Sequence, residues 1–316
     1  MAVSATNTYT GAGLAEDFED VINNVNKADT PLYSMAKKKK ATGKYHQWQV
    51  ESLAAAAANK QLEGDDASFG TLTATTVLGN YCQISRKTVQ ISGTYDAVKK
   101  YGRKSELAHQ LVKSGKELRR DMEYAMCRNQ ASDDGSAGTA RATAGAESMI
   151  YTNVITSNAA ATTPGFSAGI WSAPTDGTAT TFLEADLKSA LALAWVDGGD
   201  PSVIMMSTVN KARFDAFAGI ATKYNEVKGT TQADIVGAAD LYVSSFGNHK
   251  VVLNRYMRDK SVFGLDPDYV SVATLRPIQQ ESLAKTGDSE KRMVLAEYCL
   301  VMDSIDAHCK IDGIGA

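Results

Sequence analysis

The sequence lacks the residue patterns that mark several common classes of protein. Its four cysteines include no CxxC pair and are not set against histidines at zinc-finger intervals. A disulfide framework or a zinc site is therefore not indicated. We expect buried, reduced thiols at all four positions, Cys82, Cys127, Cys299 and Cys309.

Long apolar runs and an excess of positive charge are also missing. No segment reaches ~18 consecutive apolar residues, and the N-terminus has no basic stretch followed by an apolar one. We therefore expect neither a membrane span nor secretion. Lys and Arg total 33 against 36 Asp and Glu, a formal net charge of -3. Such a chain has no overall field that attracts nucleic acid, so any DNA contact must be local.

Signatures of catalysis and cofactor binding are equally scarce. The GxG at 11–13 has no third glycine and no strand before it, which argues against a dinucleotide site. None of the four histidines has HExxH spacing, and no GxSxG elbow is present. The carboxylate pairs Asp65–Asp66 and Asp133–Asp134 are flanked by Gly or Ser, which favours turns. We expect no enzyme activity, no cofactor and no metal.

The chain is nevertheless long enough to bury a core, since 44% of its 316 residues are hydrophobic. Residues alternate over 44–51, with Trp48 and Val50 on one side, which predicts a strand, and 81–92 predicts a second. The interval 52–80 contains an alanine run and then Gly, Asp and Ser. Because structureless loops of this length are uncommon within compact domains, we expect an arm that reaches a neighbouring subunit.

A single long amphipathic helix is predicted at 95–130, where apolar residues recur at spacings near three, four and seven without a proline. It carries nine basic residues against five acidic ones. If one face of the protein meets DNA, we expect it to be the basic face of this helix, through contacts to phosphate. The alternative is that these residues form salt bridges between subunits. The candidates for DNA contact are Lys99, Arg103, Lys113 and Arg120.

Two features near the N-terminus can also be interpreted from the sequence. Leu14–Lys27 predicts a short amphipathic helix, ended by a breaker at Asp29–Pro31, in an arm that needs a partner to hold it. The Lys37–Lys40 run is interpreted as a solvated connector in preference to a contact with phosphate.

The rest of the chain mixes helices with strands. Residues 132–180 are rich in Ala, Thr, Gly and Ser and predict a β-rich surface insertion. Helices are expected at 183–195 and 209–218, with a strand between them. Met293–Met302 is apolar on both faces and predicts a central strand, in a hairpin closed by a turn at 286–289. The fold class is α+β.

An ordered set of short motifs resembles one family of phage major head proteins. The motifs of the C-terminal third are Leu253–Tyr256, Leu265–Tyr269, Leu275–Pro277, Leu283–Ser289, and Glu297 before Leu300. Those of the N-terminal third are Thr30–Leu32, Gly43, Trp48 and Leu53. Each motif alone is weak, but the ordered set covers most of the chain. That family is similar to capsid proteins of the Hong Kong 97 type.

The resemblance implies a division of the chain into an arm, an extended loop and two interleaved domains. The expected ranges are 1–36 for the N-terminal arm, 37–92 for the extended loop with its flanking strands, 93–194 and 265–316 for a peripheral domain that contains the spine helix (95–130) and the 132–180 insertion, and 195–264 for an axial domain. Trp48, Val50 and Leu53 are the expected subunit-interface residues.

The function implied is that of a major capsid protein of a tailed double-stranded DNA bacteriophage. Many copies would form pentamers and hexamers of an icosahedral head, assembled in the bacterial cytoplasm and retained in the virion. The implied partners are other copies of the chain, a scaffolding protein, a portal, a decoration protein and DNA bound without sequence specificity. Two alternatives remain: a cellular nanocompartment shell of the same fold, and an enzyme with an α+β core.

Overall fold

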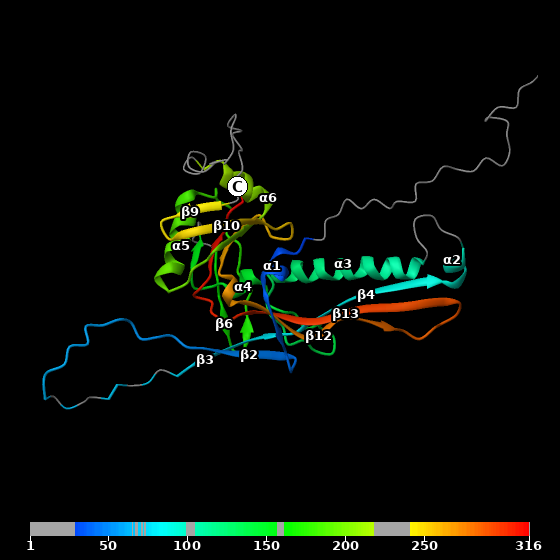
Figure 1. Ribbon diagram of the computed structural model, residues 1–316, viewed down its shortest axis with the longest axis horizontal. Helices are drawn as coiled ribbons and strands as arrows, with labels where there is room; N and C mark the ends of the chain where they lie inside the picture. Colours follow the sequence, from blue (N-terminus) through cyan, green and yellow to red (C-terminus); the bar gives the residue numbers. More distant parts are fainter. Residues whose placement is uncertain are drawn as a thin grey trace, which may run out of the picture.

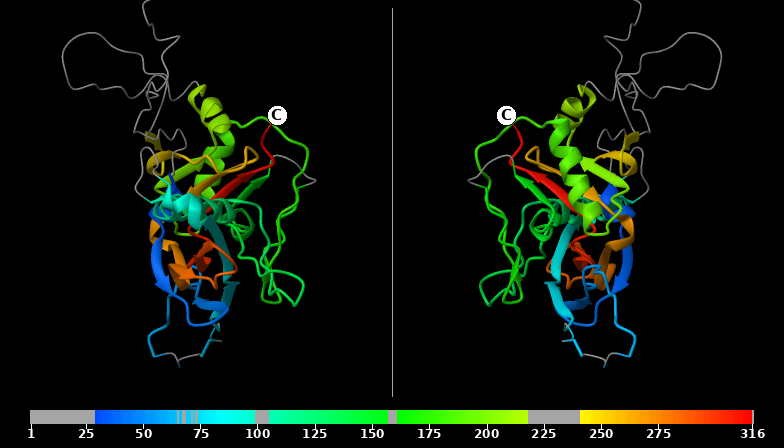
Figure 2. Two further views of the ribbon diagram at one scale, coloured as in Figure 1. Left: turned by 90° about the vertical axis from the view of Figure 1, so that its right-hand side faces the viewer. Right: turned by 90° about the vertical axis from the view of Figure 1, so that its left-hand side faces the viewer.

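The computed structural model describes residues 29–64, 66, 69–70, 72, 74–98, 105–156, 161–217 and 241–315. A four-stranded sheet runs along a long helix, and a six-stranded sheet stands at one end of that helix (Figures 1 and 2). A pair of strands leads into a loop that projects clear of both sheets (Figure 1). The predicted helix Leu14–Lys27 lies outside the described residues.

The four-stranded sheet has the order β1-β12-β13-β4, with bounds of Lys37–Lys40, Val270–Ser282, Ser289–Met302 and Gln83–Ser92. The last nine residues of β13 are all buried, because packed clusters lie against both faces of the strand. The prediction of a central strand late in the chain is confirmed. The hairpin of β12 and β13 is confirmed too, and Gly287 takes a φ of +81° in its turn.

The two faces of this sheet bury different clusters. Tyr298 and Leu300 lie in the larger core, together with the apolar face of the long helix. Cys299 and Val301, which alternate with them along β13, lie in a smaller cluster on the opposite face. The period of two along one strand therefore separates the two clusters.

The long helix is shorter than the sequence predicts. Helix α2 spans Gly93–Ala97, and the spine helix α3 spans only Glu106–Cys127, or about 33 Å at ~1.5 Å per residue. The prediction of one helix over 95–130 is wrong. Ser105 has extended backbone and accepts a hydrogen bond from the Ala108 N–H, which makes it an N-cap. The helix therefore begins at a capping serine that apolar periodicity alone does not reveal.

The six-stranded sheet has the order β5-β14-β11-β8-β10-β9. Its strands are Val154–Thr156, Cys309–Asp312, Ser261–Leu265, Val203–Met206, Gly247–Leu253 and Leu241–Ser244. Helix α5 (Glu184–Val196) packs on β14, and α6 (Thr208–Asp215) follows β8 directly. The predictions of a helix, a strand and a helix in this stretch are confirmed, with α6 ending earlier than expected.

The segment 132–180 lies only in part at the surface that its composition predicts, because residues 143–150 and Trp171 are buried. It contains helix α4 (Ala146–Met149) and two-residue strands β6 (Phe166–Ser167) and β7 (Ile170–Trp171). Trp171 is fully buried, and its Nε1 donates to the Gly79 carbonyl at 2.7 Å. The small residues around α4 allow the backbone to pack closely, so part of this segment belongs to the main core.

Candidate subunit interfaces

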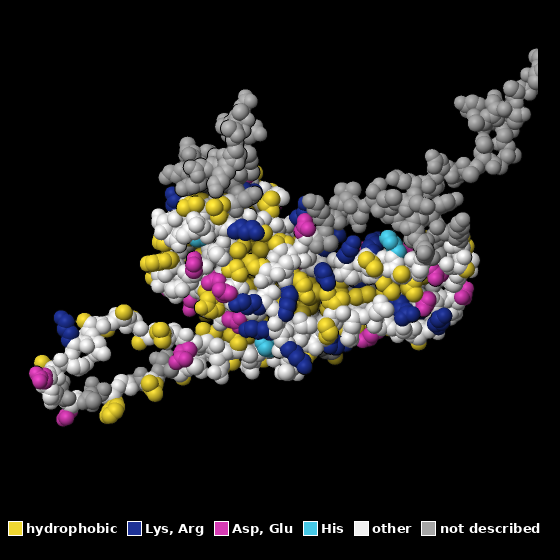
Figure 3. All heavy atoms as spheres, in the orientation of Figure 1, with side chains coloured by type: hydrophobic (Ala, Val, Ile, Leu, Met, Phe, Trp, Pro, Cys, Tyr) yellow, Lys and Arg dark blue, Asp and Glu magenta, His cyan; other side chains and the backbone are white. Residues whose placement is uncertain are grey.

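A loop at residues 51–75, called the projecting loop below, joins β2 (Tyr45–Val50) to β3 (Thr76–Tyr81). All of its described residues are exposed, and four of them are large apolar side chains: Leu53, Leu62, Phe69 and Leu72. Phe69 is 98% exposed. Figure 3 shows these hydrophobic side chains on a loop that extends away from the body of the molecule. Exposed apolar groups on such a loop are suited to contact with another subunit.

The three interface residues expected from the sequence lie at different depths on this feature. Trp48 and Val50 are partly buried at the root of the loop and pack against the core, whereas Leu53 is 95% exposed beyond it. Trp48 and Val50 therefore already have partners within the chain. As an interface candidate, Leu53 belongs with the other exposed apolar residues of the projecting loop, and the assignment of all three stays a prediction.

The N-terminal arm is attached to the spine helix by one buried carboxylate. Glu123 on α3 accepts hydrogen bonds from the backbone N–H groups of Leu32 and Tyr33, at 2.8 Å each. These residues belong to helix α1 (Pro31–Met35), and the side-chain amide of Asn254 donates to the same carboxylate at 2.7 Å. Burial raises the pKa of Glu123, while the backbone donors act to lower it.

Sequence analysis did not single out Glu123, because nothing in the pattern around it distinguishes it from other charged residues of the helix. Asn254, by contrast, lies within one of the family motifs. A buried polar residue that satisfies two main-chain donors holds its partner segment at a fixed place. The junction therefore connects the arm, the spine helix and the turn that follows β10.

The Lys37–Lys40 run is a strand, which corrects its interpretation as a connector. All four lysines of β1 are exposed, while the backbone pairs in parallel with β12. Lys37 Nζ lies 2.8 Å from the Asp268 carboxylate, and Lys39 Nζ lies 2.5 Å from that of Asp303. Lysines on an edge strand also oppose unwanted pairing with further strands.

The cations predicted to face DNA are only partly described, because Lys99 and Arg103 lie outside the described residues. Lys113 lies 3.9 Å from the Glu117 carboxylate one turn away. Arg120 stacks 5.9 Å from the centre of the Tyr256 ring. Lys113 is exposed and Arg120 is partly buried, and DNA contact stays a prediction.

A buried ionic network joins α4 to the six-stranded sheet. Arg258 binds Glu147 at 2.9 Å and also pairs with Asp176, while the fully buried Lys310 lies 3.2 Å from Asp312. Burial raises the pKa of Glu147 to about 7, although Arg258 acts in the opposite direction. The carboxylates of Glu147, Asp176 and Asp312 lie close enough together to hold a metal ion. Each of them also pairs with Arg258 or Lys310, so we interpret the network as structural.

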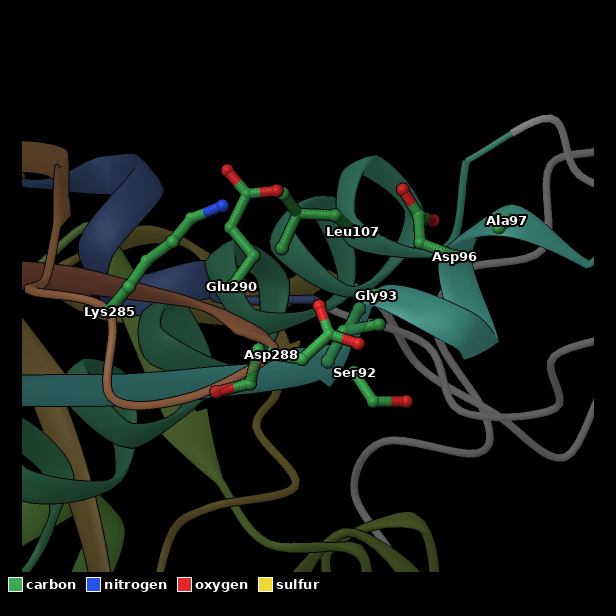
Figure 4. A pocket seen from close by; sticks show the side chains of 10 residues that line it. Ser92, Gly93, Asp96, Ala97, Leu107, Lys285, Asp288 and Glu290 are labelled. Atoms are coloured by element: carbon green, nitrogen blue, oxygen red, sulfur yellow. The ribbon is translucent and has the colours of Figure 1, made fainter.

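A hollow of about 280 Å³ lies at the far end of the spine helix, between the end of β4, α2 and the β12–β13 turn (Figure 4). Its lining includes Asp96, Asp288, Glu290 and Lys285, but no histidine or cysteine. The Ser92 hydroxyl already caps α2 by accepting from the Tyr95 N–H. No nucleophile in this hollow is set against a general base, as acyl transfer would require.

A sheet laid along a long helix, a second sheet at its end and a projecting loop together make up the Hong Kong 97-like fold. Solved structures agree: the capsid of cyanophage A-1(L) has a TM-score of 0.68 at 14% identity, covering 98% of each chain. The capsid of a native GTA particle has a TM-score of 0.62 at 11% identity, again covering 98% of each chain.

Sequence comparison defines the family. The SU10 major capsid protein family matches residues 3–315, and the chain belongs to this family. The major capsid protein of Escherichia phage Phieco32 is 26% identical over 328 residues, which covers 93% of this chain and 92% of that protein. The protein is thus a shell-forming phage capsid protein and a component of the virion, not an enzyme.

No helix among the described residues is both long enough and apolar enough to cross a membrane.

Proposed function

We propose that this chain builds the icosahedral head of a tailed phage from pentamers and hexamers, and that the head encloses packaged double-stranded DNA. The observation that carries the proposal is the projecting loop, whose large apolar side chains are exposed on the isolated subunit. In a ring of subunits, each loop would lie on the next copy by a heterologous contact that repeats until the ring closes. The loop would then be buried in every subunit.

The division into domains follows the same proposal. Strands β12 and β13 and helix α3 would form the centre of the peripheral domain (93–194 and 265–316), which β1 and β4 join from the 37–92 range, and the six-stranded sheet would form the centre of the axial domain (195–264). Strands β5 and β14 join that second sheet from outside 195–264, so the axial domain takes support from the peripheral segments. Residues 1–36 would be the arm and 37–92 the extended loop with its strands.

DNA contact would be local and independent of sequence. Lys113 and Arg120 on α3 support it, and Lys99 and Arg103, which lie outside the described residues, remain candidates from the sequence alone. Their contribution would come from neutralising phosphates, so it would weaken as salt rises. A scaffolding protein, a portal and a decoration protein are the further partners that we propose, with assembly in the cytoplasm of a bacterial host.

The test is to express the chain alone and together with its candidate scaffolding protein, and to examine the products by negative-stain electron microscopy and sedimentation. Closed shells or capsomer rings are expected. A compact monomer that persists at high concentration would contradict the proposal. The contents of purified particles distinguish the two kinds of shell. Nuclease-protected DNA indicates a phage head, whereas an enclosed protein indicates a nanocompartment.

A further inference from the structure

Two of the four cysteines face each other across neighbouring strands. Strands β4 and β13 pair antiparallel, with Gln83 opposite Tyr298. One step further along the same register places Cys82 opposite Cys299. Residues directly opposite each other in an antiparallel pair share a face of the sheet, with Cα atoms about 4.5–5.5 Å apart. That separation lies within the range of about 4.4–6.8 Å that a disulfide requires.

Cys82 and Cys299 lie in the same small buried cluster. Both side chains are fully buried, and each thiol shifts the pKa of the other as a hydrogen-bonding neighbour. They belong to one small cluster whose other buried members are Ala41, Ala273 and Val301. The Cys82 thiol also lies 3.6 Å from the Gly43 carbonyl, which it reaches as a weak donor.

The two thiols differ in acidity. Oxidation begins at a thiolate, so the thiol with the lower pKa reacts more readily. The hydrogen bond from Cys299 lowers the pKa of Cys82, because it stabilises the thiolate. The same contact, together with burial, raises the pKa of Cys299. Cys127 and Cys309 have pKa values raised mainly by burial, and their hydrogen bonds involve Glu123, Asn254 and the backbone instead of a second thiol. Cys82 is thus the sulfur better able to react first.

We propose that Cys82 and Cys299 form an oxidation-sensitive dithiol, which a peroxide converts into an intrachain disulfide. The Cys82 thiolate attacks one peroxide oxygen, the O–O bond breaks, and Cys82 becomes a sulfenic acid as hydroxide leaves. Cys299 then attacks the Cys82 sulfur, and the sulfenic oxygen departs as water with the thiol proton. In total two thiols are oxidised to one disulfide, and one hydrogen peroxide is reduced to two waters.

The position of the bond gives it a mechanical consequence. Cys82 lies between β3 and β4, where the chain returns from the projecting loop into the four-stranded sheet. Cys299 lies in β13, the strand that this sheet buries most completely. The disulfide would fix the root of the loop to the centre of the peripheral sheet. It would also close a loop spanning most of the chain, which constrains the unfolded state.

The test uses the purified full-length chain, treated with hydrogen peroxide and then alkylated in denaturant without reductant. We expect two of the four thiols to escape alkylation, an intact mass before alkylation that is lower by two hydrogen atoms, and a peptide that joins residues 82 and 299. Dithiothreitol should restore both thiols. The oxidised chain should unfold at a higher temperature than the reduced chain.

Matched variants locate the reaction. C82S and C299S should each prevent both the mass loss and the rise in unfolding temperature, whereas C127S and C309S should retain both. The peptide map of the wild-type chain decides the matter even if a serine variant fails to fold. The proposal is overturned if both thiols stay alkylatable after peroxide has oxidised added glutathione. It is also overturned if Cys82 stops at a sulfinic acid, or if these cysteines link two chains.

Discussion

The four-stranded sheet with α3 and the projecting loop contain the same kinds of apolar residue in opposite surroundings. Leu300 in β13 and Leu118 on α3 are fully buried, while Phe69 and Leu72 on the loop are almost fully exposed. The sheet and the helix bury each other's apolar side chains within one chain, and this packing stabilises the folded subunit. The described loop residues have no such burial within the chain, and under the proposed function another copy would supply it.

The largest effect expected is in the core, where L118A removes a fully buried side chain between α3 and the sheet. We expect a loss of about 2–5 kcal/mol in the free energy of unfolding, measured by urea denaturation. V112A, an exposed position on the same helix, is the control and should change stability by no more than about 0.5 kcal/mol. Equal losses in the two variants would break the distinction between buried and exposed faces.

The next effect concerns the junction that holds the arm. E123A leaves the backbone N–H groups of Leu32 and Tyr33 and the Asn254 amide without their acceptor. Each unsatisfied buried donor costs about 1–3 kcal/mol, so we expect a total loss of roughly 3 kcal/mol after relaxation. E117A, on the more exposed side of α3, should cost no more than about 0.5 kcal/mol. Proteolysis at the arm should also become faster in E123A alone.

A third effect depends on pH and comes from the buried ionic network. Glu147 has a folded pKa of about 7, above the value of 4.5 expected when unfolded, so the folded chain binds more protons between those values. Its contribution to stability is therefore present below pH 4.5 and is lost as pH rises through 7. By about 1.36 kcal/mol per pKa unit, the loss totals roughly 3 kcal/mol.

The E147Q variant isolates that contribution, because its side chain does not titrate. Between pH 5 and pH 8, the stability of E147Q relative to the wild type should rise by up to roughly 3 kcal/mol in urea denaturation. E281Q, at an exposed position, is the matched control and should follow the wild type at every pH. A constant difference between E147Q and the wild type would contradict the raised pKa.

A substitution in the projecting loop is expected to have the smallest effect on the stability of the subunit but a large effect on assembly. F69S should change the free energy of unfolding by less than about 0.5 kcal/mol, because the side chain is exposed. It should still reduce the yield of closed shells, scored by sedimentation and electron microscopy. K60S, at another exposed position of the same loop, should assemble normally. Normal assembly of F69S would remove this residue from the proposed interface.

Sequence patterns predicted the elements whose partners lie nearby in the chain or whose period is regular. Strand β13 was identified by its apolar run, and the hairpin with β12 by the turn at 286–289. The position of α3 was also predicted, but not its start, because the Ser105 cap gives no signal in apolar spacing. Part of the segment 132–180 was wrongly expected at the surface, since small residues are found both in loops and in tightly packed cores.

The sequence by itself determined the class of fold, the order of its parts and the absence of catalytic motifs, because periodicity, turns and motif order are local properties. Only the tertiary structure decided which charges and thiols meet. Glu123 reaches the arm, Arg258 reaches Glu147, and Cys82 reaches Cys299 over separations of about ninety residues or more. Burial then sets their chemistry, since desolvation and a partner's charge act on a side chain only once the fold has brought the groups together.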